Sequence, residues 1–319
     1  MLALVCADPP RLVSDHPPPA RGAGEARLRM RLAGICDTDL QLARGYMGYR
    51  GVLGHEVVAE VVECDSAGWL GRRVVADINA GCGRCQDCRE AGGHHCPTRS
   101  VLGILARDGA LAEELVVPER CLVSVPEAVP DERAVFAEPL AAALHVLDEL
   151  PEDFSGKALV LGDGKLGLLI AQALASADLP VTLVGHHPDK LALGRDLGAR
   201  TLLESELDRG AERAPLVVEA TGSNAGLALA LSLTEPRGTL VLKTTVAGRS
   251  EVDLSPIVID ELRVVGSRCG DMQRAVTALA AGLDPTPLVA ARYPLARAAE
   301  ALAHAGRKGT LKVLVEGAR

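Results

Sequence analysis

Residues 158–167 read Ala-Leu-Val-Leu-Gly-Asp-Gly-Lys-Leu-Gly, and they decide the fold of the surrounding chain. An apolar run typical of a buried strand leads into Gly-x-Gly-x-x-Gly, and a helical pattern at 168–177 follows. In this motif the first glycine makes the turn, the second lets a pyrophosphate approach the backbone, and the third packs helix against strand. Free amides and the positive helix end then hold the phosphates. We therefore predict a dinucleotide site formed by Gly162, Gly164, Lys165, Leu166 and Gly167.

The alternation of strands and helices continues after this motif. Strand-like segments at 181–184, 216–219 and 239–242 are separated by helical segments at 188–197 and 227–233. Such alternation is typical of a parallel sheet that is covered by helices. We predict a doubly wound Rossmann domain over residues 129–270. We also assign Thr221, which follows one of the strands, to the cofactor site.

The residue at the end of the second strand bears on the choice of cofactor. An NAD-binding protein usually places Asp or Glu about 20 residues after the glycines, where it holds the ribose 2′-hydroxyl. Here that position is Gly185, and His186 and His187 follow it. A 2′-phosphate fits where no carboxylate repels it, so we predict that NADP is preferred over NAD, with His186 or His187 donating to the phosphate. The alternative is a turn with two exposed imidazoles.

A second candidate site lies nearer the N-terminus, where residues 34–39 read Gly-Ile-Cys-Asp-Thr-Asp and residues 51–56 read Gly-Val-Leu-Gly-His-Glu. Zinc accepts sulfur, nitrogen and carboxylate oxygen, and a catalytic zinc keeps one open position beside three protein ligands. Cys36, His55 and Glu56 supply these three atom types. The alternative interpretation is structural, because a buried cysteine behaves as a small apolar residue.

Four of the nine cysteines are crowded into residues 82–96. Three of them follow one another at two-residue spacing and a fourth comes after, at Cys82, Cys85, Cys88 and Cys96. Gly81 and Gly83 permit a tight loop, and four thiolates complete a tetrahedral zinc site that has no position for a substrate. We therefore predict a structural zinc here, which gives two zinc ions per chain. We expect His94 and His95 to be exposed to solvent.

Composition limits the other possibilities. The chain has 319 residues and a formal net charge of -8 at pH 7, so electrostatics gives no reason to expect nucleic acid as a partner. No segment has the pattern of a signal peptide or a membrane span. We expect a cytoplasmic protein without membrane partners. The β-rich opening and the apolar segment 311–315 predict a second domain made of residues 1–128 and 271–319.

Taken in order, these features resemble the zinc-containing medium-chain dehydrogenase/reductase superfamily over nearly the whole chain. They are Gly-Ile-Cys-x-Thr-Asp, Gly-His-Glu, the four cysteines, Glu138-Pro139 and the glycine motif. Glu138-Pro139 stands where other alcohol dehydrogenases carry a cysteine ligand, so the sorbitol and threonine dehydrogenase branch is the most similar. The resemblance implies an α/β fold, with a GroES-like β-rich catalytic domain and a Rossmann domain. It also implies a homodimer or homotetramer.

The resemblance assigns roles to single residues near the predicted zinc. Cys36 and His55 are implied as ligands of the catalytic zinc, and Glu56 and Glu138 are implied to share the third ligand place, directly or through water. Thr38 matches the hydroxyl that passes a proton from the zinc-bound alcohol.

Further positions are compared with the family in the same way. Lys312 falls where relatives keep a basic residue on the pyrophosphate, and the alternative is a solvated lysine at a strand end. Gln41 stands where threonine dehydrogenases place a relay histidine, which puts threonine in doubt as the substrate. Asp37 or Asp39 is a candidate to orient His55, although we expect both to be exposed.

We therefore predict a zinc-dependent oxidoreductase that transfers a hydride between a nicotinamide cofactor and an alcohol or polyol, or the matching aldehyde or ketone. Zinc suits this reaction because it acidifies a bound hydroxyl toward neutrality. One alternative is a zinc-bearing member of the superfamily that reduces an activated C=C bond, and another is a non-catalytic nucleotide-binding protein. Tyr46, Tyr49 and Phe136 are candidates for the substrate pocket, unless they belong to the core.

Overall fold

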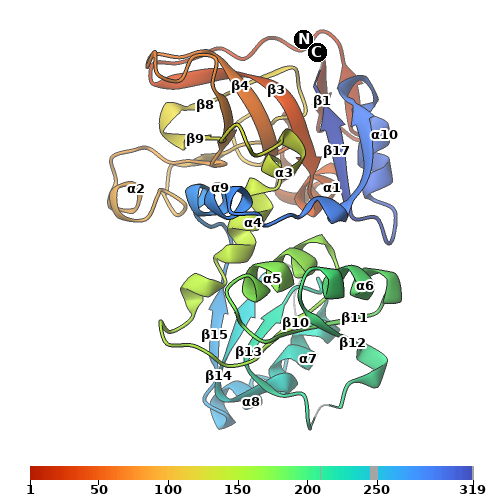
Figure 1. The fold of residues 1–319 in the computed structure, drawn as a ribbon. Coiled ribbons are helices and arrows are strands. Elements are labelled where there is room, and N and C mark those ends of the chain that lie inside the picture. The colour runs from red at the N-terminus through yellow and green to blue at the C-terminus, as the bar shows by residue number, and fades with distance from the viewer. Residues whose placement is uncertain (209, 245–250, 318–319) are drawn as a thin grey trace. The chain divides into compact units, whose positions relative to one another are not determined.

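The computed structural model describes residues 1–208, 210–244 and 251–317. Two compact units make up the chain. The first consists of Met1–Glu138 together with Met272–Arg319, and the second consists of Pro139–Asp271. Figure 1 shows that the first unit contains both the red and the dark blue parts of the chain. The sequence-based domain boundaries at 128/129 and 270/271 stay a prediction.

The first unit is built on a seven-stranded sheet whose strands are β3 (Glu25–Ile35), β4 (Glu56–Glu63), β5 (Arg73–Ala76), β8 (Glu114–Pro118), β9 (Leu122–Ser124), β16 (Val289–Pro294) and β17 (Lys312–Glu316). They lie in the order β16-β17-β3-β4-β5-β9, and β8 also pairs with β3. Side chains alternate between buried and less buried along the first part of β3 and are all buried at its end. The end of β3 therefore lies in the core of the unit.

Shorter elements complete the first unit. β1 (Ala3–Val5) pairs with β2 (Arg11–Val13), and β6 (Asn79–Ala80) pairs with β7 (Ser100–Val101). The helices are α1 (Asp37–Ala43), α2 (Gln86–Glu90), α3 (Asp131–Ala134), α9 (Met272–Ala280) and α10 (Ala298–Ala305). Single 3-10 turns are η1 (Tyr46–Gly48), η2 (Glu119–Cys121), η5 (Thr286–Leu288) and η6 (Leu295–Arg297).

The second unit is built on a six-stranded sheet whose strands are β10 (Ala158–Leu161), β11 (Val181–Gly185), β12 (Arg200–Leu203), β13 (Ala214–Glu219), β14 (Thr234–Leu242) and β15 (Arg263–Gly266). They lie in the order β12-β11-β10-β13-β14-β15, and all neighbours are parallel. β10 and β11 are buried throughout, which explains their continuous apolar runs. The predicted doubly wound α/β fold is confirmed.

Helices connect the parallel strands of the second unit. They are α5 (Lys165–Ala175), α6 (Pro188–Asp196), α7 (Asn224–Leu233) and α8 (Ser255–Ile259), with a 3-10 turn η4 (Glu204–Glu206). The chain passes from the first unit to the second in α4 (Ala137–Leu144), and η3 (Leu147–Glu149) follows. None of the helices in the described ranges combines the length and the apolar character that a membrane crossing requires.

The pairing of three strands positions Cys36 and His55, two of the candidate zinc ligands. β3 pairs antiparallel with β4 on one side and with β17 on the other, so that Gly34 lies opposite both Glu56 and Leu314. Cys36 directly follows β3 and His55 directly precedes β4. The end of one strand and the beginning of its neighbour therefore bring a thiol and an imidazole together, with the start of β17 on the other side.

Candidate functional site

Three side chains of different chemistry converge where β3 ends and β4 begins. One potential ligand atom from each of Cys36, His55 and Glu56 lies within 4.8 Å of the other two. His55 and Glu56 are buried, whereas Cys36 is half-buried. A thiol, an imidazole and a carboxylate at these separations match the ligand types of a catalytic zinc, which keeps a further position for substrate. The three residues therefore fit a zinc ion, and their assignment as its ligands stays a prediction.

Asp39 supports the His55 ring. Its buried carboxylate accepts hydrogen bonds from the backbone N–H of Cys36 at 2.8 Å and of Gly54 at 3.0 Å, and it lies 3.3 Å from His55 Nδ1. Burial works to raise the pKa of Asp39, but His55 and the two amides outweigh it and hold the pKa below its ordinary value. The expected exposure of Asp39 is therefore wrong, while Asp37 is indeed exposed. A carboxylate at Nδ1 leaves Nε2 as the nitrogen for a metal.

Lys312 forms a buried ion pair with Glu56. Its Nζ lies 2.6 Å from Oε1 and 2.5 Å from Oε2 of Glu56, and only 2% of the lysine side chain is exposed. Burial works to lower the pKa of Lys312, but the charge of Glu56 outweighs it and raises that pKa above its ordinary value. The Glu56 carboxylate lies over Gly34, where a Cβ would overlap it.

The sequence-based alternative of a solvated Lys312 at a strand end is wrong, because the side chain is buried. Its ammonium faces Glu56, whose buried carboxylate requires a counter-charge. The sequence did not reveal this pair, since its members are 256 residues apart. The contact of Lys312 with the cofactor pyrophosphate stays a prediction.

Thr38 and Glu138 lie beside the three potential ligands. Thr38 Oγ1 is 3.8 Å from Cys36 Sγ. Burial raises the pKa of Glu138 to about 7; the charge of His55 opposes this shift and the charge of Glu56 adds to it. Among the described residues Glu138 does not belong to the set within 4.8 Å, so that set contains Glu56 as its carboxylate.

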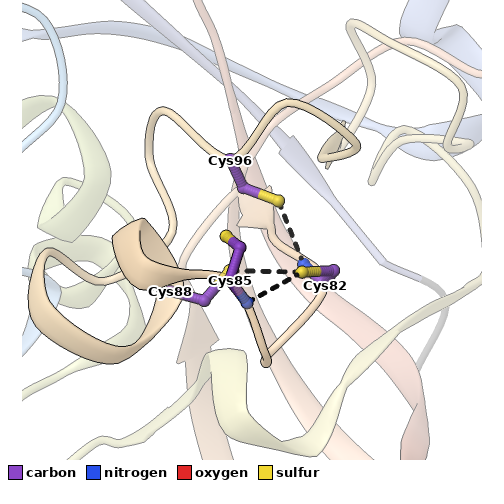
Figure 2. Close-up of side chains that lie close together, drawn as sticks. All are labelled: Cys82, Cys85, Cys88 and Cys96. Atoms are coloured by element: carbon purple, nitrogen blue, oxygen red, sulfur yellow. Dashed lines mark hydrogen bonds between the residues drawn. The ribbon is translucent and has the colours of Figure 1, made fainter.

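Four cysteines of one loop form a second candidate metal centre (Figure 2). Their sulfur atoms all lie within 4.8 Å of one another and belong to Cys82, Cys85, Cys88 and Cys96. The backbone N–H of Cys85 points at Cys82 Sγ at 3.4 Å, and that of Cys82 points at Cys96 Sγ at 3.3 Å. Amides of Arg84 and Cys85 lower the pKa of Cys82 to about 6, which favours the metal-binding thiolate. Four sulfurs fit a structural zinc.

Glycines and an aspartate shape this loop. A Cβ on Gly81 would stand 2.6 Å from Cys88 Sγ, and Gly83 has a φ of 74°, so both positions favour glycine. His95 is exposed as expected. His94 is instead half-buried, and its Nε2 lies 2.9 Å from Asp77 Oδ2. The expected exposure of His94 is wrong because Asp77 holds its ring against the loop.

Each glycine of the motif after β10 meets a different steric demand. Gly162 has a φ of 110°, and a Cβ there would stand 2.6 Å from the carbonyl oxygen of Ala220. Gly164, directly before α5, has open space where a Cβ would be, so a ligand can approach its backbone. A Cβ on Gly167 would overlap the carbonyl oxygen of Gly162, which shows how closely α5 packs on the turn. This geometry fits a pyrophosphate at the helix N-terminus.

The other predicted cofactor residues surround the same turn. Lys165 and Leu166 begin α5. Thr221 lies beside Gly162, and its N–H and hydroxyl donate to Glu219 Oε1 at 2.7 Å and 2.6 Å. Their contact with a cofactor stays a prediction.

Asp163, between the first two glycines, fills the space beside Gly185. Its Oδ2 accepts hydrogen bonds from the backbone N–H of His186 at 2.8 Å and of His187 at 2.7 Å, and His187 Nδ1 lies 3.0 Å from both carboxylate oxygens. Burial works to raise the pKa of Asp163, but the bonds from His187 outweigh it and lower that pKa. Sequence reasoning missed Asp163, although an acid inside the motif and a missing acid at Gly185 together signalled it.

Both histidines after β11 face a carboxylate. His187 is paired with Asp163, and His186 Nε2 lies 3.2 Å from Glu204 Oε2. The side chains of His186 and His187 are 67% and 36% exposed. Of the alternative with two exposed imidazoles, the exposure of His186 agrees with the structure, whereas His187 is only partly exposed, and each ring faces a carboxylate.

The aromatic candidates for a substrate pocket separate into different environments. Phe136 is fully buried, and Lys312 Nζ lies 5.7 Å from the centre of its ring, so it belongs to the core. The hydroxyl of Tyr49 is within 2.9 Å of the carbonyl oxygens of Val52 and Arg107, which gives it a structural role. Tyr46 is 44% exposed. A hollow of about 460 Å³ lies nearby, lined by residues 47–51 and 104–108.

Comparison with known proteins agrees with this geometry. A family model described as "Alcohol dehydrogenase GroES-like domain" matches residues 22–127, and one described as "Zinc-binding dehydrogenase" matches residues 166–283. The chain is 31% identical over 302 residues to an erythritol/L-threitol dehydrogenase of Mycolicibacterium smegmatis, which covers 85% of this chain and 83% of that protein. It is 34% identical over 225 residues to an L-threonine 3-dehydrogenase of Chelativorans sp., covering 66% and 64%.

Solved structures extend the similarity to the whole chain. A short chain alcohol dehydrogenase from Escherichia coli, complexed with NADH, superposes with a TM-score of 0.90 at 28% identity and covers 99% of both chains. A zinc-binding dehydrogenase from Sinorhizobium meliloti, bound to NADP, gives a TM-score of 0.87 at 27% identity and covers 99% of this chain and 98% of that chain.

Proposed function

This chain belongs to the zinc-containing medium-chain dehydrogenase/reductase superfamily, and on that premise we propose that Cys36, His55 and a glutamate bind the zinc with which it acts on alcohols. The protein is an oxidoreductase that transfers a hydride between a nicotinamide cofactor and an alcohol or polyol, or the matching aldehyde or ketone. The convergence of three unlike ligand atoms within 4.8 Å carries the residue assignment.

The residues around this set would hold and orient the metal. When bound, zinc lowers the pKa of a coordinated hydroxyl and polarises a carbonyl oxygen. Asp39 keeps the His55 ring in place, and Lys312 keeps Glu56 in place. We propose that Glu56 and Glu138 share the third ligand place, since Glu56 has an atom in the set and Glu138 is buried close enough to His55 and Glu56 for their charges to act on its carboxyl group.

Thr38 is the proposed carrier of the substrate proton. Its hydroxyl is 3.8 Å from Cys36 Sγ, at the side of the proposed metal position. A hydroxyl group both donates and accepts hydrogen bonds, so it can pass a proton from an alcohol toward solvent. Gln41 has no titratable group, so the proton path does not continue through an imidazole at that position.

NADP is the proposed preferred cofactor over NAD, with the phosphates on the Gly162–Gly167 turn. Gly185 presents no carboxylate to a ribose 2′-phosphate, and two imidazoles follow it. The nearby carboxylate of Asp163 is only 6% exposed, and its charge is covered by two amides and the His187 ring. Relatives do not decide the choice, because one solved structure holds NADH and another holds NADP.

A structural zinc on the four-cysteine loop is the second proposed metal ion of each chain. A homodimer or homotetramer is proposed as the assembly, and two features of the second unit support it. β15 is the outer strand of its sheet, and three apolar side chains near it are exposed, namely Leu254, Val258 and Ile259. None of the nine cysteines forms a disulfide, which suits the reducing cytoplasm, the proposed location.

Turnover measurements with a panel of alcohols test the proposed function. The panel contains primary and secondary alcohols, polyols and hydroxy amino acids, each offered with NAD⁺ and with NADP⁺, and the reduced nicotinamide is monitored. We expect oxidation of an alcohol or polyol with greater kcat/KM for NADP⁺. We also expect activity to be lost on chelation and to return with zinc. A protein that reduces an activated C=C bond and ignores the alcohols would overturn the proposal.

A further inference from the structure

One carboxylate joins two loops at the carboxyl ends of neighbouring parallel strands. Asp163 lies in the turn after β10, His187 lies just after β11, and these strands pair in parallel register. A Cβ on Gly185 would stand 2.5 Å from both Cβ and Oδ2 of Asp163. The Asp163 carboxylate therefore occupies the space in which a side chain at position 185 would begin.

Position 185 matters because, in dinucleotide-binding folds, the residue at the end of the second strand contacts the adenosine ribose. An acid at the end of the second strand normally offers its oxygens to the 2′-hydroxyl. Asp163 brings an acid to the same place from the glycine turn, but its oxygens already accept from the amides of His186 and His187 and from the His187 ring. The group left to meet a ligand there is the imidazole, of which 36% is exposed.

The Asp163 contact also selects which ring nitrogen of His187 is available. Nδ1–H donates to the carboxylate at 3.0 Å, and no hydrogen bond to Nε2 occurs within the described part of the chain. A second proton on the ring therefore resides on Nε2, where it can donate a charge-assisted hydrogen bond to a phosphate oxygen.

We propose that His187 determines the specificity for the 2′-phosphate of the nicotinamide cofactor and that Asp163 is the positioning residue that acts through it. This inference rests on the proposed preference for NADP. It explains why position 185 is glycine, since a larger residue there would displace Asp163 and release the His187 ring.

The neighbouring histidine, His186, is the other candidate donor to the 2′-phosphate, and its variant distinguishes the two rings. His186 has the same ring, its centroid is 6.5 Å from that of His187, and its backbone N–H also bonds Asp163. Its side chain instead faces Glu204 and is 67% exposed. Removing the His186 ring therefore shows whether the preference for the 2′-phosphate depends on this ring or on that of His187.

Binding of two small probes to the full-length protein tests the proposal without turnover. The probes are adenosine 2′,5′-bisphosphate and adenosine 5′-monophosphate, and their Kd values are measured by calorimetry for the wild type and for His187→Ala, Asp163→Asn, the double variant and His186→Ala. Because a hydrogen bond to a charged group is lost, we expect preference for the bisphosphate to fall about tenfold in both single variants. The double variant should lose no more, and His186→Ala should stay within about twofold of the wild type.

Each outcome decides the matter. Equal weakening of both probes in His187→Ala and Asp163→Asn leaves the preference unchanged and overturns the inference, because the carboxylate then only joins the loops. A wild type without preference for the bisphosphate overturns both the NADP preference and the inference. His187→Ala keeps the amide bonds to Asp163, so it decides alone if Asp163→Asn fails to fold. Loss of alcohol oxidation, which would refute the hydride-transfer reaction for this chain, is measured separately and does not affect these Kd values.

Discussion

The single residue Asp39 holds three groups in place. Its buried carboxylate accepts hydrogen bonds from two backbone amides and also faces the His55 ring. A buried charge is tolerated when it is paired and hydrogen-bonded, and removal of one partner is costly. The same holds for Glu56 and Lys312, which neutralise each other in the core. The chemistry of the proposed zinc site therefore also depends on Asp39 and Lys312, which hold proposed ligands and need not touch the metal.

Replacement of Asp39 by asparagine should weaken zinc binding at Cys36 and His55. Loss of a carboxylate behind a metal-binding imidazole typically reduces metal affinity about 10–100-fold. Competition with a chelating dye measures this affinity. Asp37→Asn is the matched control, because Asp37 is exposed on the same helix and its variant should bind zinc as the wild type does. Equal affinities in the two variants would show that Asp39 does not orient His55.

Glu138 should make the zinc-free protein less stable as the pH rises. Its pKa is about 7 in the folded protein, against an ordinary value of 4.5, so the folded state retains this proton between those two values. The stabilisation is thus complete below the lower value and is lost as the pH passes through about 7.

Glu138→Gln mimics the protonated carboxyl group and should remove this pH dependence. Relative to the wild type, we expect its free energy of unfolding to be similar at acid pH and about 1–2 kcal/mol larger at alkaline pH, after allowance for partial exposure. Urea unfolding of the zinc-free proteins at both pH values provides the measurement. If the free energies of unfolding of the two proteins differ by the same amount at both pH values, the pKa of Glu138 is not raised in the folded protein.

At the scale of elements, strand register and loop glycines assemble both sites. Gly34 on β3 leaves room for the side chain of Glu56 on β4 to lie over that strand and to reach Lys312 of β17. The turn between β10 and α5 likewise combines a positive φ at Gly162 with close helix packing at Gly167. Glycine is required at these places because a backbone or carboxylate occupies the space of its absent side chain.

Two alanine substitutions in the glycine turn should impair different properties, one the stability of the fold and the other the binding of the cofactor. Gly167→Ala places a Cβ on the carbonyl of Gly162 and should lower the free energy of unfolding by about 2 kcal/mol. Gly164→Ala enters open space at a φ of -78°, so it should leave stability nearly unchanged and weaken cofactor binding where the methyl meets the pyrophosphate. Thermal unfolding and cofactor titration separate the two. Unimpaired cofactor binding in Gly164→Ala would contradict the assignment of this turn.

The four-cysteine loop should be sensitive to Gly81. A methyl group there would stand 2.6 Å from Cys88 Sγ, so Gly81→Ala should displace this sulfur and lower zinc retention at the loop during dialysis against a chelator. Gly68→Ala is the control, because no atom lies within 4 Å of its added methyl group. If both variants retain zinc equally, the loop does not form the proposed four-sulfur site.

At the scale of the whole molecule, the sequence predicted features formed by neighbouring residues better than it predicted contacts between distant residues. The strand-turn-helix at Gly162 and the cysteine spacing report on neighbouring residues, so the α/β fold was predictable, and the four cysteines were expected to gather as they do. Pairing of Lys312 with Glu56 depends on a strand that returns from the end of the chain, which no local pattern encodes. Asp163 was missed for a related reason, since its role appears only when β10 and β11 lie side by side.

The zinc content of Cys36→Ser, measured together with its turnover, tests the central assignment most directly. We expect two zinc ions per chain in the wild type and in the control Cys64→Ser, since the Cys64 sulfur faces the carbonyl of Ser66 outside both clusters. In Cys36→Ser we expect one zinc ion, unchanged cofactor binding and no alcohol oxidation. A Cys36→Ser protein that keeps both zinc ions and oxidises alcohols at the wild-type rate would refute the assignment.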